Sequence, residues 1–356
     1  MTNLTRPMFP HTIDSTMLAA FRSCPQKMFR TYIQHWKPQT ESVHLVAGGA
    51  FAKGIEVARK AYFEGEMVIP TVSYPVNPVT GLVERKVDWN TVKTENVTAD
   101  REQAENLGIA ALMAHYGDFE CPPESAKSLE RTAGALEFYF QAYPLGEDGM
   151  SPIKLAGGRF GIEYSFAHPL PVNHPVTGNP LLYTGRSDMI ADYMGGRYIV
   201  DEKTTSQLGA SWPRQWEMRS QFTGYAWAAL EDGIKTDGAI VRGVSILKTK
   251  YDTLQANTYR GDWEIDRWIT QVERDLIRMK QCWEDGWWDY NMDTACGEYG
   301  GCSLLQICKS KDPETWLGSY FEQKVWDPLA RRQLTVQEWE ASWEPERGRM
   351  TELVKV

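Results

Sequence analysis

A glycine pair near the middle of the chain most constrains how this sequence can fold. Gly195-Gly196 separates two runs rich in Tyr, Ile, Val and Met, residues 183–194 and 197–203. A two-residue Gly-Gly connection between such runs is typical of a β-hairpin, because a type I′ turn needs a positive φ at both central residues. The sequence therefore predicts two antiparallel strands joined by a Gly195-Gly196 turn.

Counting outward from this turn predicts a register in which Asp188 lies opposite Lys203 and Ile190 opposite Asp201. Alternate side chains of a strand share one face, so two carboxylates roughly 7 Å apart or less at Cβ would lie beside an ammonium. Burying such groups unpaired would cost several kcal/mol, so this face is poor core material. It suits a divalent cation and an anionic substrate. The plainer alternative is a surface salt-bridge cluster.

Length and charge narrow the class of protein. A chain of 356 residues, 42% of them apolar, can form one large soluble domain or two modest ones. The formal net charge of -9 argues against a protein that binds polyanions non-specifically. It leaves room for a nucleic-acid enzyme whose basic residues are confined to one groove.

The sequence also predicts a cytoplasmic protein. No apolar run approaches the ~20 residues of a transmembrane helix, and the N-terminal residues have no signal-peptide core. Six cysteines are too few for a disulfide scaffold in a chain of this length, so metal binding or simple burial is expected of them.

Three cysteines form a pattern of their own. Cys296, Cys302 and Cys308 are separated by five residues each, in a segment with several glycines. This spacing predicts ligation of a metal or a cluster, and four-thiolate sites are usual for structural zinc and for iron–sulfur clusters. A fourth ligand is then needed, for which Cys282 is nearest in sequence but lies within a predicted helix, and Cys121 is isolated before Pro122-Pro123. Cys24 precedes Pro25 at the junction of two predicted helical segments, the first with Ser15 as its N-cap, and on its own it is expected to be a buried thiol.

Other candidate residues lie on predicted helices and strands around the hairpin. Glu56 lies on a helix that begins in a glycine-containing segment, where it is either a site residue or a solvated surface group. Gln221 and Tyr225 lie one turn apart on an amphipathic helix and point the same way. Glu163, on a strand predicted over residues 158–167, is an additional candidate metal ligand. An aromatic run at residues 138–143 is expected to be core, with a base-stacking surface as the alternative.

The order of these motifs resembles the PD-(D/E)xK nuclease superfamily, in particular its RecB-like exonuclease branch and related phage and CRISPR-associated nucleases. The matching residues are Asp188 in GRSDMI, the Asp201-x-Lys203 motif and the pair Gln221-x-x-x-Tyr225. The resemblance implies an α/β fold in which a central mixed sheet is flanked by helices. It implies that these five residues are catalytic, and that Glu56, Asp188 and Asp201 bind Mg²⁺ or Mn²⁺.

The same resemblance implies a cluster site. The segment STMLAAFRSCPQKMFRTYI looks like one in which a cysteine pairs at a distance with three cysteines near the C-terminus. The set Cys24, Cys296, Cys302 and Cys308 would then hold a 4Fe-4S cluster that staples the two chain ends together, with Zn²⁺ as the alternative. The sequence departs from the family pattern in its cysteine spacing and at Ala52, where many relatives carry a metal-binding His.

These features predict three regions and one activity. Residues 1–150 are expected to form a helical region with the first-motif helix, residues 151–260 the nuclease core, and residues 261–356 a helical region with the cysteine cluster. The expected activity is metal-dependent hydrolysis of DNA, by an exonuclease acting on single strands or ends in phage or bacterial recombination, repair or replication. A helicase or recombination protein would be its partner. The alternative is a catalytically silent DNA-binding subunit of a recombination complex.

Overall fold

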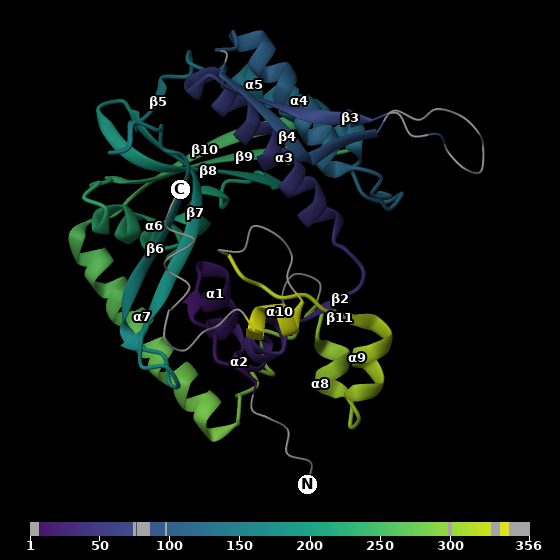
Figure 1. The fold of residues 1–356 in the computed structure, drawn as a ribbon, viewed down its shortest axis with the longest axis vertical. Coiled ribbons are helices and arrows are strands. Elements are labelled where there is room, and N and C mark those ends of the chain that lie inside the picture. Colours follow the sequence, from purple (N-terminus) through teal and green to yellow (C-terminus); the bar gives the residue numbers. More distant parts are fainter. Residues whose placement is uncertain are drawn as a thin grey trace.

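The fold is built on a mixed β-sheet (Figure 1). The computed structural model describes residues 7–73, 76, 86–96, 98–297, 301–328 and 335–341. Within them, seven strands join in one sheet, along the order β1-β7-β8-β9-β10, with β5 and β6 also pairing with β7. The strands are β1 (Thr12–Ile13), β5 (Met150–Pro152), β6 (Ile162–Asn173), β7 (Pro180–Tyr193), β8 (Gly196–Thr205), β9 (Gly238–Ile246) and β10 (Tyr251–Tyr259). The pairs β1-β7 and β8-β9 are parallel, and the other pairs are antiparallel.

Three helices cover one face of the sheet (Figure 1). They are α3 (Val43–Arg59), which continues as a π-helical turn over Lys60–Glu64, α4 (Arg101–Tyr116) and α5 (Leu129–Ala142). α3 and α4 cross closely at two glycines, since a Cβ added to Gly108 would lie 2.6 Å from the carbonyl oxygen of Gly54. Tyr139 and Phe140 of α5 are buried, so the aromatic run supplies core, as predicted.

The opposite face is covered by α1 (Ser15–Ser23), α6 (Ser220–Glu231) and α7 (Asp262–Asp285) (Figure 1). A 3₁₀ turn, Pro213–Trp216, precedes α6. The helices bury a largely aromatic and aliphatic core against β6, β7 and β9, with Tyr183 and Phe222 fully inside. The predicted α/β class with a helix-flanked mixed sheet is therefore confirmed.

Segments from both ends of the chain lie side by side below the sheet (Figure 1). β2 (Trp36–Pro38) pairs with β11 (Phe321–Gln323) next to α2 (Pro25–Met28) and a π-helical turn, Phe29–Ile33. α8 (Leu305–Lys309), α9 (Glu314–Tyr320) and α10 (Val336–Ala341) belong to the same region. A separate two-stranded sheet joins β3 (Glu66–Ser73) to β4 (Lys86–Asn96).

The predicted hairpin is present, but its register was wrong by two residues. The turn is Met194-Gly195, with φ values of 48° and 83°, and Gly196 is already paired with Tyr193. Ile190 therefore lies opposite Ile199 rather than Asp201, and Asp188 does not lie opposite Lys203. A shift of two residues keeps every side chain on its predicted face, because the strand period is two.

The predicted N-cap of the first helix was also wrong by one residue. The Asp14 side chain accepts a hydrogen bond of 2.7 Å from the Met17 backbone N–H, so Asp14 caps α1 and Ser15 is its first residue. Among the described residues, no helix combines the length and the apolar composition needed to cross a membrane.

Candidate functional site

The two aspartates of the candidate site lie where two paired strands separate. The pairing of β7 with β8 ends at Met189 opposite Val200, after which β7 continues beside β6 and β1, and β8 beside β9. Asp188 and Asp201 are the next residues beyond that last pair. The Asp188 carboxylate crosses the opening, because its Oδ2 accepts a hydrogen bond of 3.0 Å from the Glu202 backbone N–H.

Asp201 and Lys203 point to the same side of β8 and form an ion pair. The Lys203 Nζ lies 2.5 Å from the Asp201 Oδ2, with the aspartate almost fully buried and the lysine about one-third exposed. Burial and then the charge of Asp201 raise the pKa of Asp188 well above its ordinary value. Burial also raises the pKa of Asp201, against the opposing effect of Lys203. Two neighbouring carboxyl groups are thus held where ionising both is unfavourable.

The pKa of Lys203 shifts in the direction that favours its charged form, unlike the pKa values of the two aspartates. Burial alone would lower the pKa of Lys203, but the charges of Asp201 and Asp188 outweigh it and raise that pKa above the ordinary lysine value. The ammonium therefore keeps its proton at neutral pH. It supplies one positive charge next to two groups that would carry two negative charges when ionised.

Gln221 and Tyr225 reach the same place from α6. The Gln221 Nε2 donates a hydrogen bond of 3.0 Å to the Tyr225 hydroxyl, so the predicted one-turn pairing is present. Burial and the charge of Asp201 raise the pKa of Tyr225, which places its phenol in the field of the aspartates. The start of α6 is held by α1, since the Arg22 Nη1 donates a hydrogen bond of 2.6 Å to the Ser220 hydroxyl.

Glu56 lies on α3 between two lysines. Its carboxylate is 3.0 Å from Lys53 and 3.0 Å from Lys60. Burial opposes ionisation, but the two ammonium groups outweigh it and lower the pKa of Glu56. These lysines were not predicted as neighbours of Glu56, although they lie three and four residues from it on one helix, a spacing that brings side chains together. Ala52, one turn before Glu56, is exposed.

Glu163 on β6 is an acidic residue that acts electrostatically on Asp188 and is itself affected by Glu56. Its backbone has a positive φ of 52°, a strained conformation for a residue other than glycine. The carboxylate pairs with the Arg186 Nε at 2.8 Å. Burial raises the pKa of Glu163 to about 7, with Glu56 adding to the rise. Glu163 in turn adds to the raised pKa of Asp188.

The chain matches a known family over most of its length. The family model described as the PD-(D/E)XK nuclease superfamily matches residues 15–309. This chain belongs to the PD-(D/E)XK nuclease superfamily. The matched range includes every residue of the candidate site described so far, and the predicted resemblance to this superfamily is confirmed.

Two solved structures are similar to this PD-(D/E)XK nuclease. One is a protein named "Putative exonuclease" from Eubacterium rectale, with 11% sequence identity, a TM-score of 0.45 and coverage of 94% of each chain. The other is a protein named SSO0001, with 13% identity and a TM-score of 0.26, covering 50% of this chain and 69% of that one. A search of curated proteins finds no significant match.

The four cysteines named for a cluster lie in one region of this PD-(D/E)XK nuclease. Burial and then the charges of Cys302, Cys24 and Cys296 raise the pKa of Cys308 to about 11, against the opposing effect of Arg30, so the other three thiols are near enough to act on Cys308. The Cys302 backbone N–H donates a hydrogen bond of 3.0 Å to the Cys296 carbonyl. Cys121 and Cys282 do not contribute to this shift.

Backbone contacts hold Cys24 beside the C-terminal cysteines. The Gln26 N–H donates a hydrogen bond of 3.0 Å to the Asp289 carbonyl, and the Asn291 side chain donates one of 2.9 Å to the Ser23 carbonyl. Segments more than 260 residues apart are therefore joined on both sides of Cys24. Among the described residues, no three His, Cys, Asp or Glu side chains are arranged to hold a metal ion, at the cysteines or at the aspartates.

Proposed function

We propose that this PD-(D/E)XK nuclease hydrolyses DNA phosphodiester bonds with a divalent metal ion, as a RecB-like exonuclease acting on single strands or ends. The observation that carries the proposal is the Asp201–Lys203 ion pair at the opening between β7 and β8, with Asp188 and Tyr225 beside it. Phosphate cleavage needs a site that neutralises added negative charge. This opening gathers carboxylates and a protonated amine where such charge would develop.

The donor set at the opening fits Mg²⁺ or Mn²⁺. Asp188 and Asp201 are hard oxygen donors whose mutual repulsion a divalent cation would relieve, and Glu56 is the third candidate ligand. When bound, the cation would lower the pKa of a bound water and polarise a phosphate oxygen. Lys203 would offset charge on the phosphate, since its raised pKa keeps it protonated. Gln221 and Tyr225 would position the strand by contacts to phosphate or sugar.

One observation favours a second candidate function, a catalytically silent DNA-binding subunit of a recombination complex. Glu56 is engaged by Lys53 and Lys60, and Ala52 offers no ligand on that helix. A site of this kind could bind the DNA backbone without cutting it. The two candidates predict different products from the same DNA.

Labelled DNA distinguishes the two functions. We expect purified protein to shorten end-labelled single- or double-stranded DNA with Mg²⁺ or Mn²⁺, and EDTA to stop the reaction. Release of the end label in small products would indicate an exonuclease, whereas fragments cut at internal positions would indicate an endonuclease. A mobility shift of intact DNA, with no cleavage under any metal condition, would instead support the binding subunit and contradict the proposed activity.

The cysteine set fits a 4Fe-4S cluster that staples the chain ends, or a structural Zn²⁺. The four thiols come from both ends of the chain and act on Cys308 together, and thiolates are the donors that both groups use. Either group would favour thiolates and so offset the raised pKa of Cys308. The bound cluster or zinc ion would hold α1 and α2 against the segment that follows α7.

Replacing Cys24 by serine tests this second site. We expect Cys24→Ser to lose bound iron, with its broad visible absorption, or bound zinc, and to unfold at a lower temperature. Cys121→Ser and Cys282→Ser are matched controls, because these thiols are also partly buried and lie outside the set. The measurements are metal analysis, the visible spectrum and thermal unfolding. Equal metal content in all three variants would contradict the assignment.

A further inference from the structure

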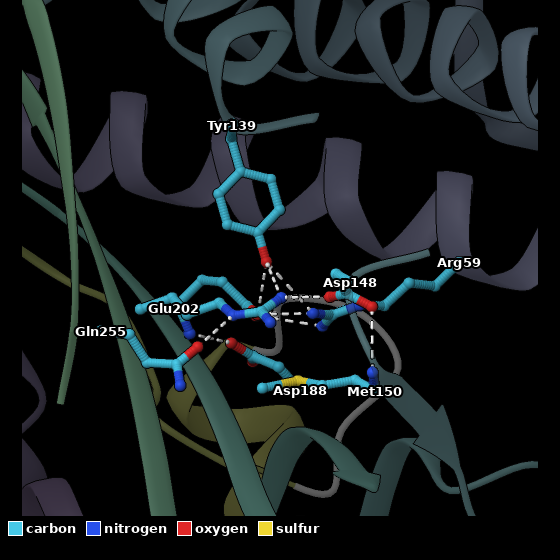
Figure 2. A network of polar contacts seen from close by, with 8 residues as sticks. Arg59, Tyr139, Asp148, Met150, Asp188, Glu202 and Gln255 are labelled. Atoms are coloured by element: carbon cyan, nitrogen blue, oxygen red, sulfur yellow. Dashed lines mark hydrogen bonds and ion pairs between the residues drawn. The ribbon is translucent and has the colours of Figure 1, made fainter. Parts of the chain in front are cut away.

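Glu202, between Asp201 and Lys203, points away from the candidate site into a buried polar network. The Arg59 guanidinium contacts the Glu202 carboxylate at two points. The Arg59 Nη1 lies 3.0 Å from the Glu202 Oε2, and the Arg59 Nη2 lies 2.5 Å from the Glu202 Oε1. The Tyr139 hydroxyl donates a further hydrogen bond of 2.9 Å to Oε1 (Figure 2). All three side chains are buried, with exposed fractions of 3%, 2% and 7% for Arg59, Tyr139 and Glu202.

The network continues to a second buried ion pair. The Arg242 Nη1 lies 2.6 Å from the Asp148 Oδ2 and donates a hydrogen bond of 3.4 Å to the Tyr139 oxygen. Its Nε donates another of 3.1 Å to the Gln255 side chain (Figure 2). Two arginines thus face two carboxylates, and the formal charges of the network balance.

Of the two ion pairs, the Arg59–Glu202 pair is the one whose own residues lie on the helix and the strand that carry the candidate site, whereas Arg242 lies on β9, opposite Glu202. The Glu202 backbone N–H holds the Asp188 carboxylate at 3.0 Å, and Glu202 stands between Asp201 and Lys203 on β8. Arg59 lies three residues after Glu56 on α3. One pair therefore connects α3, β8 and β7, each of which brings a residue to the site. Figure 2 shows Asp188 and Arg59 approaching Glu202 from different elements.

A buried ion pair is a poor way to gain stability. Removing two charges from water costs several kcal/mol, and well-packed apolar residues of similar volume are often as stable or more stable. The two-point contact between a guanidinium and a carboxylate is directional, whereas apolar packing is not. The pair therefore calls for an explanation other than stability, and its contacts with the site residues provide one.

We propose that Arg59 and Glu202 are positioning residues for the metal site. This inference rests on the proposed function. The pair fixes the Glu202 main chain so that its N–H stays on Asp188 and Asp201 and Lys203 stay on the opposite side of the strand. Side chains that orient metal ligands without touching the metal typically change metal affinity by about 10- to 100-fold when they are replaced.

The test replaces both charges together, because removing one would leave the other buried and unpaired. The double variant Arg59→Met/Glu202→Leu should keep or raise the unfolding temperature. We expect it to bind Mn²⁺, measured by calorimetry or by the free-ion EPR signal, about tenfold more weakly than wild type. The matched control is Arg242→Met/Asp148→Leu, which removes the other pair of the same network and should leave Mn²⁺ affinity unchanged.

Hydrogen exchange gives a second readout that needs no metal. In the metal-free Arg59→Met/Glu202→Leu variant, amides of β8 around residue 202 should exchange faster than in wild type and in the control variant. Unchanged β8 exchange, or equal loss of Mn²⁺ affinity in both double variants, would overturn the inference. If wild type itself binds no Mn²⁺, the proposed function fails, and the exchange rates still decide whether the pair positions β8.

Discussion

Replacing Asp201 by asparagine, or Lys203 by methionine, should lower metal-dependent DNA cleavage by roughly 100- to 1,000-fold or more. Asparagine keeps the shape of Asp201 but not the charge that would hold the cation. Methionine keeps the length of Lys203 but not the ammonium that lies 2.5 Å from Asp201. The measurement is the rate of release of labelled nucleotides from DNA at saturating Mn²⁺.

The two variants should differ in stability, which separates loss of chemistry from loss of fold. Asp201→Asn removes the ion-pair partner of Lys203 but also the charge that raises the pKa of Asp188, and Asp188 still faces Lys203, so the metal-free variant should lose less stability than Lys203→Met at neutral pH. Lys203→Met removes the cation that opposes that rise, so this variant should be less stable. Both effects would appear in denaturant unfolding with EDTA present.

A surface ion pair supplies the control for both variants. Lys235 and Asp262 form a salt bridge with both side chains 71% exposed, and exposed pairs of this kind contribute little. Lys235→Met should therefore cleave DNA at the wild-type rate. Full activity in Lys203→Met would remove this lysine from the mechanism, and full activity in Asp201→Asn would do the same for the aspartate.

Local rules predicted most of the site because its residues follow short-range patterns. Alternation along β8 placed Asp201 and Lys203 together, and helical spacing placed Gln221 beside Tyr225. The register error came from one assumption, that both glycines would occupy the turn. Met194 instead takes a left-handed conformation while its side chain remains 87% exposed, so no packing conflict signals the choice.

The long-range parts of the site have no signal in a single sequence. Glu202 meets Arg59 across 143 residues and Tyr139 across 63. Nothing in the local sequence around any of these residues indicates its partner. The point at which β7 separates from β8 also has no local signal in the sequence, since beyond the hairpin β7 pairs with the distant strand β1. Such features depend on how distant elements pack, which spacing rules do not describe.

Glu163 was considered from its strand position alone, and its environment predicts a measurable effect. Its pKa in the folded protein, about 7, lies above the ordinary glutamate value of 4.5 because the side chain is buried. Between these two pH values the folded protein binds more protons than the unfolded chain. The contribution of Glu163 to the stability of wild type should therefore fall as pH rises from about 4.5 to 7, and the loss should be complete above 7.

The substitution Glu163→Gln should remove this loss of stability at higher pH. A shift of this size corresponds to on the order of 2 kcal/mol after allowance for coupling to neighbouring charges. The metal-free variant should exceed wild type by about this free energy of unfolding at pH 8. At pH 4 the two should be nearly equal, because the wild-type carboxyl is then largely protonated in both the folded and the unfolded chain. Urea unfolding in EDTA at both pH values measures the difference.

Glu56 provides a control of opposite sign within the same group of carboxylates. Lys60 and Lys53 lower its pKa, so its charge contributes stability above the ordinary glutamate pKa and loses that contribution as pH falls. Glu56→Gln should therefore be less stable than wild type at pH 8, where Glu163→Gln is more stable. If Glu163→Gln instead loses stability at pH 8, its carboxylate is satisfied in the fold by Arg186, and the case for a cation beside it weakens. A gain at pH 8 would show that this strained, buried acid is held in the fold at a cost in stability, as expected of a residue kept for function.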